Sequence, residues 1–248
     1  MILLFDIGNT HTHLGLADNN RVLKQTNIPT LSWQGAKAVG YITKFIGRKK
    51  IDGAALCSVV PRATPQVRKV MAKHWGLPVF ELNAATIRGI GIDYPKPATI
   101  GADRLANSVA AWKFYGAPVV VVDFGTAVTF DVVDRRGNYV GGIITPGLSA
   151  MTDYLHEKTA LLPRIEIREV KSTIGKSTRQ AMLIGAVQGY RGLIRELIMG
   201  LKKELGARKL PVVATGGYAS LIAARMPEIS RVDPALTLEG IRLVYYAQ

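Results

Sequence analysis

The sequence predicts an α/β protein made of two related halves. Three observations predict this class: a hairpin-like segment that occurs twice, apolar runs that alternate with helical patterns, and a hydrophobic content of 48% in 248 residues. Strands that alternate with helices are typical of α/β folds. The apolar content is ample for a packed core, and the repeated segment favours two lobes, residues 1–117 and 118–248.

The second copy of the repeated segment is the clearer one. Val119–Val122 is a run of four valines, which is typical of a buried strand. Residues 123–126, Asp-Phe-Gly-Thr, interrupt the apolar run, and alternation resumes over Thr129–Val133. We therefore expect a hairpin whose turn presents a carboxylate, a bare backbone and a hydroxyl to a charged ligand.

The first copy occupies residues 1–12. Aligned without a gap, the copies share three positions: Asp6 with Asp123, Gly8 with Gly125, and Thr12 with Thr129. Consecutive backbone N–H groups around a glycine suit phosphate oxygens, and a carboxylate at the rim can hold a magnesium ion that bridges phosphates. The alternative for one copy alone is an ordinary hairpin with glycine at positive φ.

The remaining elements follow from periodicity and from glycine and proline punctuation. In the first half we expect strands at 14–17, 21–26, 53–60 and 78–82, and helices at 32–46, 64–76 and 105–115. In the second half we expect strands at 139–147 and 211–214, and helices at 148–159, 178–205 and 238–246. Glycines at 141–142 and 216–217 end strands, where a ligand can approach the backbone closely.

Composition limits the classes of partner. The formal net charge of +14 favours anions, which include nucleotides, acidic metabolites, nucleic acid and anionic membranes. The single cysteine, Cys57, excludes an internal disulfide framework and fits a reducing compartment. No apolar run approaches the ~20 residues of a membrane span, and residues 1–5 are too short for a signal peptide. We expect a soluble, cytoplasmic protein.

Several local motifs are excluded. Gly175-Lys176-Ser177 resembles the end of a phosphate-binding P-loop, but Val170 replaces the first glycine of that motif. No G-x-G-x-x-G sequence follows a strand, and one cysteine precludes a thiolate zinc cluster. His11 and His13 alternate onto one face of a strand and could share a metal, but no further ligand supports this reading.

The segment Gly101-Ala102-Asp103-Arg104 precedes the predicted helix at 105–115. A carboxylate at the start of a helix is favoured by the helix dipole, so a capping role for Asp103 is one reading. The other is a catalytic base or orienting group. Arg104 can bind an anionic substrate, because its planar guanidinium matches a carboxylate.

These motifs together resemble those of the type III pantothenate kinases, within the superfamily of acetate and sugar kinases, heat-shock chaperones and actin. The resemblance covers essentially the whole chain. Its carriers are Asp6–Thr10, Ser58–Pro61, Gly101–Arg104, Asp123–Ala127, Gly141-Gly142, Pro146-Gly147, Thr215–Gly217 and Leu236–Gly240.

The resemblance implies two ribonuclease-H-like lobes of duplicated topology, the actin-like ATPase fold, with a nucleotide cleft between them. It implies transfer of the γ-phosphoryl group of ATP to pantothenate, which gives 4'-phosphopantothenate in the first step of coenzyme A biosynthesis. It assigns ATP to Asp6, Ile7, Gly8, Asn9, Thr10, His11, Thr12, His13 and Thr126. It assigns pantothenate to Tyr94, Gly101, Ala102, Asp103, Arg104 and Thr178.

Further roles follow from the same resemblance. Asp103 would accept the hydroxyl proton, Asp6 would lie near Mg²⁺, and Asp123 would ligate the K⁺ or NH₄⁺ that family members require. The family is dimeric, so a homodimer is implied, with the pantothenate site near the subunit interface. Ser177 departs from the asparagine common before the substrate threonine, Thr178.

Two alternatives remain open. The first is a catalytically silent regulatory or accessory protein of the same fold that binds nucleotide or nucleic acid, motivated by the basic surface. The second is a kinase for another small hydroxy acid. Against the first, every polar motif residue is present, including Asp103, which a repurposed fold is free to lose. We expect neither a membrane nor a nucleic-acid partner.

Overall fold

The computed structural model describes residues 1–35 and 37–248, which fold into two compact units. Unit 1 comprises Met1–Tyr115, Gly137–Val140 and Ala235–Gln248, and unit 2 comprises Gly116–Arg136 and Gly141–Pro234. Each unit contains a mixed β-sheet with helices, so the α/β class is confirmed.

Unit 1 is built on a five-stranded sheet in the order β3-β2-β1-β4-β5. The strands are β1 (Ile2–Ile7), β2 (His11–Ala17), β3 (Val22–Pro29), β4 (Gly53–Ser58) and β5 (Val79–Glu81). β1 pairs antiparallel with β2 and parallel with β4. The first three strands therefore form a meander, and the next two are reached through helical crossovers.

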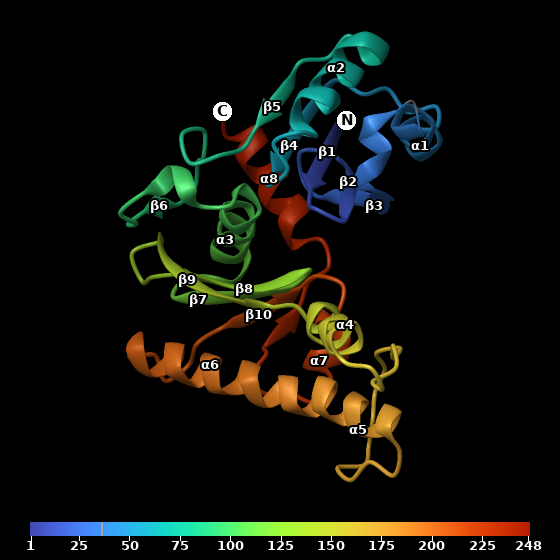
Figure 1. Ribbon diagram of the computed structural model, residues 1–248. Coiled ribbons are helices and arrows are strands. Elements are labelled where there is room, and N and C mark those ends of the chain that lie inside the picture. Colours follow the sequence, from blue (N-terminus) through green and yellow to red (C-terminus); the bar gives the residue numbers. More distant parts are fainter. Residues whose placement is uncertain (36) are drawn as a thin grey trace. The chain divides into compact units, whose positions relative to one another are not determined.

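Side-chain alternation along β1 divides unit 1 into two apolar layers. Leu3, Phe5 and Ile7 pack with α1 (Lys37–Ile46) and α2 (Thr64–Trp75). Residues 2 and 4 pack with α3 (Ala102–Tyr115) and α8 (Leu236–Tyr246), which lies beside α3 in Figure 1. Because alternate strand residues share a face, Asp6 belongs to the layer of α3 and α8.

Unit 2 contains β7 (Val119–Phe124), β8 (Ala127–Val133), β10 (Val212–Thr215), β11 (Arg231–Val232) and most of β9 (Asn138–Pro146). The order is β11-β10-β7-β8-β9, and the sheet continues from β9 to β6 (Gly91–Ile92), which pairs with the first residues of β9 inside unit 1. The helices are α4 (Leu148–Lys158), α5 (Thr178–Ile184), α6 (Tyr190–Glu204) and α7 (Ala219–Ala223). Figure 1 shows α6, in orange, running along one side of the sheet.

The predicted duplication of the hairpin is confirmed, with one correction. β1 and β7 are both six residues long, β2 and β8 are both seven, and each pair has the same pattern of burial. Asp6 pairs with His13, whereas Asp123 pairs with Thr129. The match of Thr12 with Thr129 is therefore wrong by one residue, because the turn of the second hairpin is one residue shorter.

Other boundaries differ from the predictions. The helix expected at 32–46 is divided into a 3₁₀ turn, η1 (Thr30–Gln34), and α1, and residue 36 between them lies outside the described residues. The helix expected at 178–205 contains a π-helical segment, η3 (Gly185–Gly189). α3 begins at Ala102 rather than 105. The closing helix, α8, was expected in the second lobe but belongs to unit 1, because it packs on α3.

The packing of α8 on α3 depends on close backbone approach. A Cβ atom at Gly240 would overlap the carbonyl oxygen of Ala106, and the hydroxyl of Thr237 donates a 2.7 Å hydrogen bond to Asn107 Oδ1. No helix in the described part of the chain is long and apolar enough to cross a membrane.

We predict that Gly240→Ala destabilises the protein by about 2 kcal/mol, because the added methyl forces the two helices apart. Chemical denaturation measures this change. The matched control is Gly192→Ala at an exposed position of α6, where an added Cβ meets no neighbouring side chain or other element within 4 Å. The control should be up to about 1 kcal/mol more stable than wild type, since alanine favours helix. Equal effects of the two substitutions would contradict the close approach.

Candidate active site

Two carboxylates lie on one face of the unit 1 sheet. Asp6 ends β1, and Cys57 stands opposite it on β4. The Cys57 thiol donates to Asp6 Oδ1 at 3.4 Å. Asp103 lies in the first turn of α3, which covers this face. The predicted site residues Asp6 and Asp103, far apart in sequence, are therefore brought together within unit 1.

The electrostatics of this pair are unusual for aspartates. The pKa of Asp6 is raised from 3.8 to about 7, chiefly by burial and secondly by the nearby charge of Asp103, while the Cys57 hydrogen bond partly opposes the rise. Burial also raises the pKa of Asp103, while the N–H and the charge of Arg104 lower it. A divalent cation would relieve the repulsion between the two carboxylates, so the donor set at Asp6 fits Mg²⁺.

The turn after Asp6 exposes Asn9, Thr10 and His11. The N–H of Gly8 donates to the carbonyl of His11 at 3.0 Å and closes the hairpin. This turn can present backbone and side-chain donors to an anion, as predicted from the glycine and the short polar residues.

Two residues predicted for this turn have other partners. Thr12 is fully buried on the opposite face, where its hydroxyl accepts from Trp33 Nε1 at 2.9 Å and shares a hydrogen bond with Thr30. His13 Nδ1 lies 2.6 Å from Asn27 Oδ1. Among the described residues, no group of three or more His, Cys, Asp or Glu could hold a metal, so nothing adds a third ligand to His11 and His13.

The segment 101–104 forms the start of α3. Asp103 is the second residue of α3, where the helix dipole favours a carboxylate, and its Oδ1 accepts a 2.8 Å hydrogen bond from the backbone N–H of the next residue, Arg104. An added Cβ at Gly101 would lie 2.5 Å from the same oxygen, which explains the glycine. The Arg104 guanidinium lies over the ring of Tyr139 at 5.7 Å, and this ring also contacts Tyr94. Tyr94, Asp103 and Arg104 thus belong to one neighbourhood of unit 1.

In unit 2, three glycine turns meet at the second hairpin. Asp123 is half-buried at the end of β7, and its Oδ1 lies 2.5 Å from the position of a Cβ built on Gly216, which has φ +89°. A Cβ at Gly147 would overlap the backbone of Gly125 and Thr126, and the Gly147 N–H donates to Thr126 O at 3.1 Å. A side chain at either glycine would collide with these atoms, so both glycines are needed for packing within unit 2.

The sequence analysis missed a second acid in this hairpin. Asp131 is fully buried and lies on the same face of the hairpin as Asp123, with Thr129 between them along that face. The hydroxyl of Thr129 donates to Asp131 Oδ2 at 3.4 Å. Carboxylate and hydroxyl oxygens suit a hard cation, so the residues fit a monovalent ion. A charged residue inside an apolar strand was the available signal.

Thr178 is the one predicted substrate residue that belongs to unit 2. It begins α5 in unit 2, after the N-cap Ser177, whose side chain accepts a 3.2 Å hydrogen bond from the Gln180 N–H. Tyr94 and residues 101–104 belong to unit 1.

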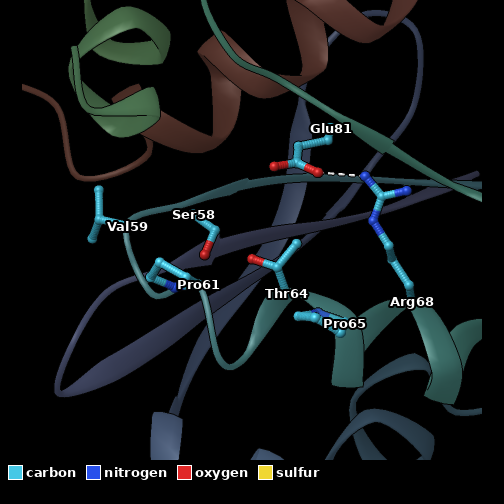
Figure 2. Close-up of a pocket in the computed structure, with 7 residues that line it drawn as sticks. All are labelled: Ser58, Val59, Pro61, Thr64, Pro65, Arg68 and Glu81. Carbon is cyan, nitrogen blue, oxygen red and sulfur yellow. Dashed lines mark hydrogen bonds and ion pairs between the residues drawn. The ribbon is translucent and has the colours of Figure 1, made fainter. Parts of the chain in front are cut away.

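A pocket of about 420 Å³ lies at the carboxyl end of β4 (Figure 2). Figure 2 shows the hydroxyls of Ser58 and Thr64 pointing toward each other, and Arg68 reaching Glu81 in an ion pair. Ser58 pairs with Ile7, so the pocket adjoins the first hairpin. None of its lining residues is a predicted site residue.

The two α/β units have the actin-like ATPase and sugar kinase fold, which is shared by solved structures named as N-acetylglucosamine and N-acetylmannosamine kinases, as a dehydratase activator and as a dehydratase component A. Residues 2–199 match the model of the type III pantothenate kinase family. The chain belongs to this family.

Individual relatives agree with this assignment. The type III pantothenate kinase of Akkermansia muciniphila is 46% identical over 242 residues, which is 97% of this chain and 96% of that relative. A solved Campylobacter jejuni protein, named as a Baf family transcriptional activator, has a TM-score of 0.59 at 17% identity and covers 99% of this chain and 98% of its own. The Clostridium difficile activator of 2-hydroxyisocaproyl-CoA dehydratase, solved with ADPNP, has a TM-score of 0.54 at 13% identity, covering 98% and 93%. At these identities the two structures show the fold alone.

We predict that Asp6→Asn changes how stability depends on pH. The folded state holds a proton on Asp6 up to about pH 7, whereas the unfolded chain releases it near pH 3.8. The free energy of unfolding of wild type therefore decreases as the pH rises from 3.8 to about 7. Asparagine removes this loss. Relative to wild type, the variant should gain on the order of 2 kcal/mol between pH 4 and pH 8 in metal-free buffer with chelator. A difference that is constant with pH would contradict the raised pKa.

Proposed function

We propose that this chain transfers the γ-phosphoryl group of ATP to the primary hydroxyl of pantothenate, the first step of coenzyme A biosynthesis. Membership of the type III pantothenate kinase family supports the activity. The structural observation that carries the proposal is the placement of Asp6 and Asp103 on one face of the unit 1 sheet, close enough for the charge of Asp103 to raise the pKa of Asp6.

In the proposed mechanism, Asp103 accepts the proton of the pantothenate hydroxyl while the hydroxyl oxygen attacks the γ-phosphorus of ATP. The raised pKa of Asp103 makes it a better proton acceptor than an ordinary aspartate. Arg104 binds the substrate carboxylate through its planar guanidinium, beside Tyr94 and Gly101. In phosphoryl transfer most of the rate comes from positioning and charge neutralisation, so an aspartate suffices as base.

We assign ATP to the two hairpin turns. In unit 1, the turn within residues 6–13 lines the phosphates, with the exposed residues Asn9, Thr10 and His11 as the main contacts, whereas Ile7 and Thr12 are fully buried. Asp6 would hold Mg²⁺, which would neutralise phosphate charge. In unit 2, Thr126 contacts ATP and Asp123 ligates K⁺ or NH₄⁺. Thr178 is assigned to pantothenate by family resemblance only.

We further propose a cytoplasmic homodimer. Unit 2 exposes large apolar side chains, including Ile144 at 64%, Tyr154 at 61% and Leu161 at 89%. Exposed apolar side chains of this size suit a subunit interface. Sedimentation of the purified protein tests this association.

A coupled kinase assay tests the function. Purified protein should convert pantothenate and ATP to 4'-phosphopantothenate only with Mg²⁺ and with K⁺ or NH₄⁺. Asp103→Asn should lower kcat about 100-fold or more, since it removes the base without changing the shape of the side chain. Asp153→Asn on α4, whose carboxylate pairs with Arg164, serves as the control and should retain kcat.

Full turnover by Asp103→Asn would show that the base is assigned wrongly. An absence of turnover in wild type, together with stabilisation by another small hydroxy acid in a thermal-shift screen, would instead show that the substrate is wrong.

The role of Asp123 predicts a separate phenotype. Asp123→Asn should raise the K⁺ concentration for half-maximal activity about tenfold, because it removes an anionic ligand, and should change the KM for pantothenate little. Glu196→Gln removes the same charge at an exposed position of α6 and controls for the net charge of unit 2. An unchanged K⁺ response in Asp123→Asn would contradict the assignment.

A further inference from the structure

Tyr139 is a buried aromatic residue that is not among the predicted site residues. It lies in the second half of the sequence, yet residues 137–140 belong to unit 1. Its side chain is 1% exposed. Its backbone pairs with Ile92 of β6, and its carbonyl accepts a 2.9 Å hydrogen bond from the N–H of Asp93. The chain that leads into Tyr94 is therefore fixed to the backbone of Tyr139.

The ring of Tyr139 contacts two side chains assigned to the substrate. The Tyr94 ring lies 6.0 Å away at an interplanar angle of 67°, an edge-to-face arrangement. The Arg104 guanidinium carbon lies 5.7 Å from the centre of the same ring, within the range of a cation–π contact. Tyr94 is 38% exposed, so one buried ring supports side chains that reach toward solvent.

The two supported residues come from different elements. Tyr94 follows β6, and Arg104 lies in the first turn of α3. Flexible side chains such as arginine lose rotamer entropy when they bind a ligand, and a residue that orders them beforehand reduces that loss. The ring of Tyr139 is the contact that Tyr94 and Arg104 share.

We propose that Tyr139 is a positioning residue for substrate recognition, holding Arg104 and Tyr94 in the arrangement that binds the substrate carboxylate. The inference rests on the proposed function, because it takes Arg104 and Tyr94 as substrate residues. The aromatic face of Tyr139 carries the role.

Steady-state kinetics test this role. Tyr139→Leu should raise the KM for pantothenate about five- to tenfold and leave the KM for ATP within about twofold of wild type. Tyr139→Phe keeps the ring and should raise the KM for pantothenate less than Tyr139→Leu does. Tyr245→Leu is the matched control, since Tyr245 packs in the same apolar layer and against Phe80 rather than against the substrate residues. It should leave both KM values unchanged.

Three results would overturn the proposal: an unchanged pantothenate KM in Tyr139→Leu, equal rises in both KM values, or a Tyr139→Phe variant as impaired as Tyr139→Leu. If Tyr139→Leu does not fold, Tyr139→Met keeps more of the side-chain volume and gives the same readouts.

An NMR measurement separates this proposal from the proposed function. The Arg104 Nε–H signal, assigned by its loss in Arg104→Lys, should be ordered in wild type and Tyr139→Phe and should become mobile in Tyr139→Leu, without substrate. A wild type that fails to phosphorylate pantothenate overturns the function and leaves this measurement valid. An equally ordered signal in Tyr139→Leu overturns the positioning role whatever the substrate.

Discussion

The structure of unit 1 is constrained by the burial of two like charges, Asp6 and Asp103, on the same face of a sheet. Burying a carboxylate costs free energy unless hydrogen bonds or opposite charge compensate. The thiol of Cys57 supplies one donor to Asp6, and the backbone N–H of Arg104 supplies one to Asp103. Burial is the larger cause of the raised pKa of Asp6 and the charge of Asp103 is the second, and the Cys57 hydrogen bond offsets only part of the rise. A cation bound beside this pair would offset the repulsion between the two carboxylates.

The duplicated hairpins show how one scaffold provides two different sites. A turn shorter by one residue changes which residues correspond, because side chains alternate between faces with period two. Cross-strand pairing makes His13 equivalent to Thr129, and Gly15 equivalent to Asp131. At Gly15, the absence of a side chain lets Leu238 of α8 pack directly on the strand. The equivalent position in unit 2 carries a buried acid instead. The first hairpin thus accepts a covering helix, whereas the second places the carboxylate of Asp131 and the hydroxyl of Thr129 on the same face as Asp123.

Local features of this fold could be predicted from the sequence, and features that depend on distant contacts could not. The valine run before Asp123 and the glycine ending α2 at Gly76, which has φ +65°, act through neighbouring residues and were recognisable. The shorter second turn was not recognisable. An ungapped alignment of the two copies matches Thr12 with Thr129, and this match hides the missing residue. Asp103 and Gly101 could be identified as a site segment from residue type. The support of Arg104 by Tyr139 could not, because it depends on a strand pairing across the sequence.

Unit 1 includes two segments from the second half of the sequence, residues 137–140 and 235–248, and both contribute to the surroundings of its site residues. α8 covers the face that carries Asp6, and it is tied to the β2–β3 region by hydrogen bonds from the Val22 N–H to Glu239 and from Arg242 to the carbonyl of Asn19. Residues 137–140 bring the ring on which Arg104 rests. The segment 1–115 alone would leave the layer around Asp6 and Asp103 open to water. Since desolvation is the largest cause of the raised pKa of both carboxylates, their chemistry depends on residues more than 100 positions away in sequence.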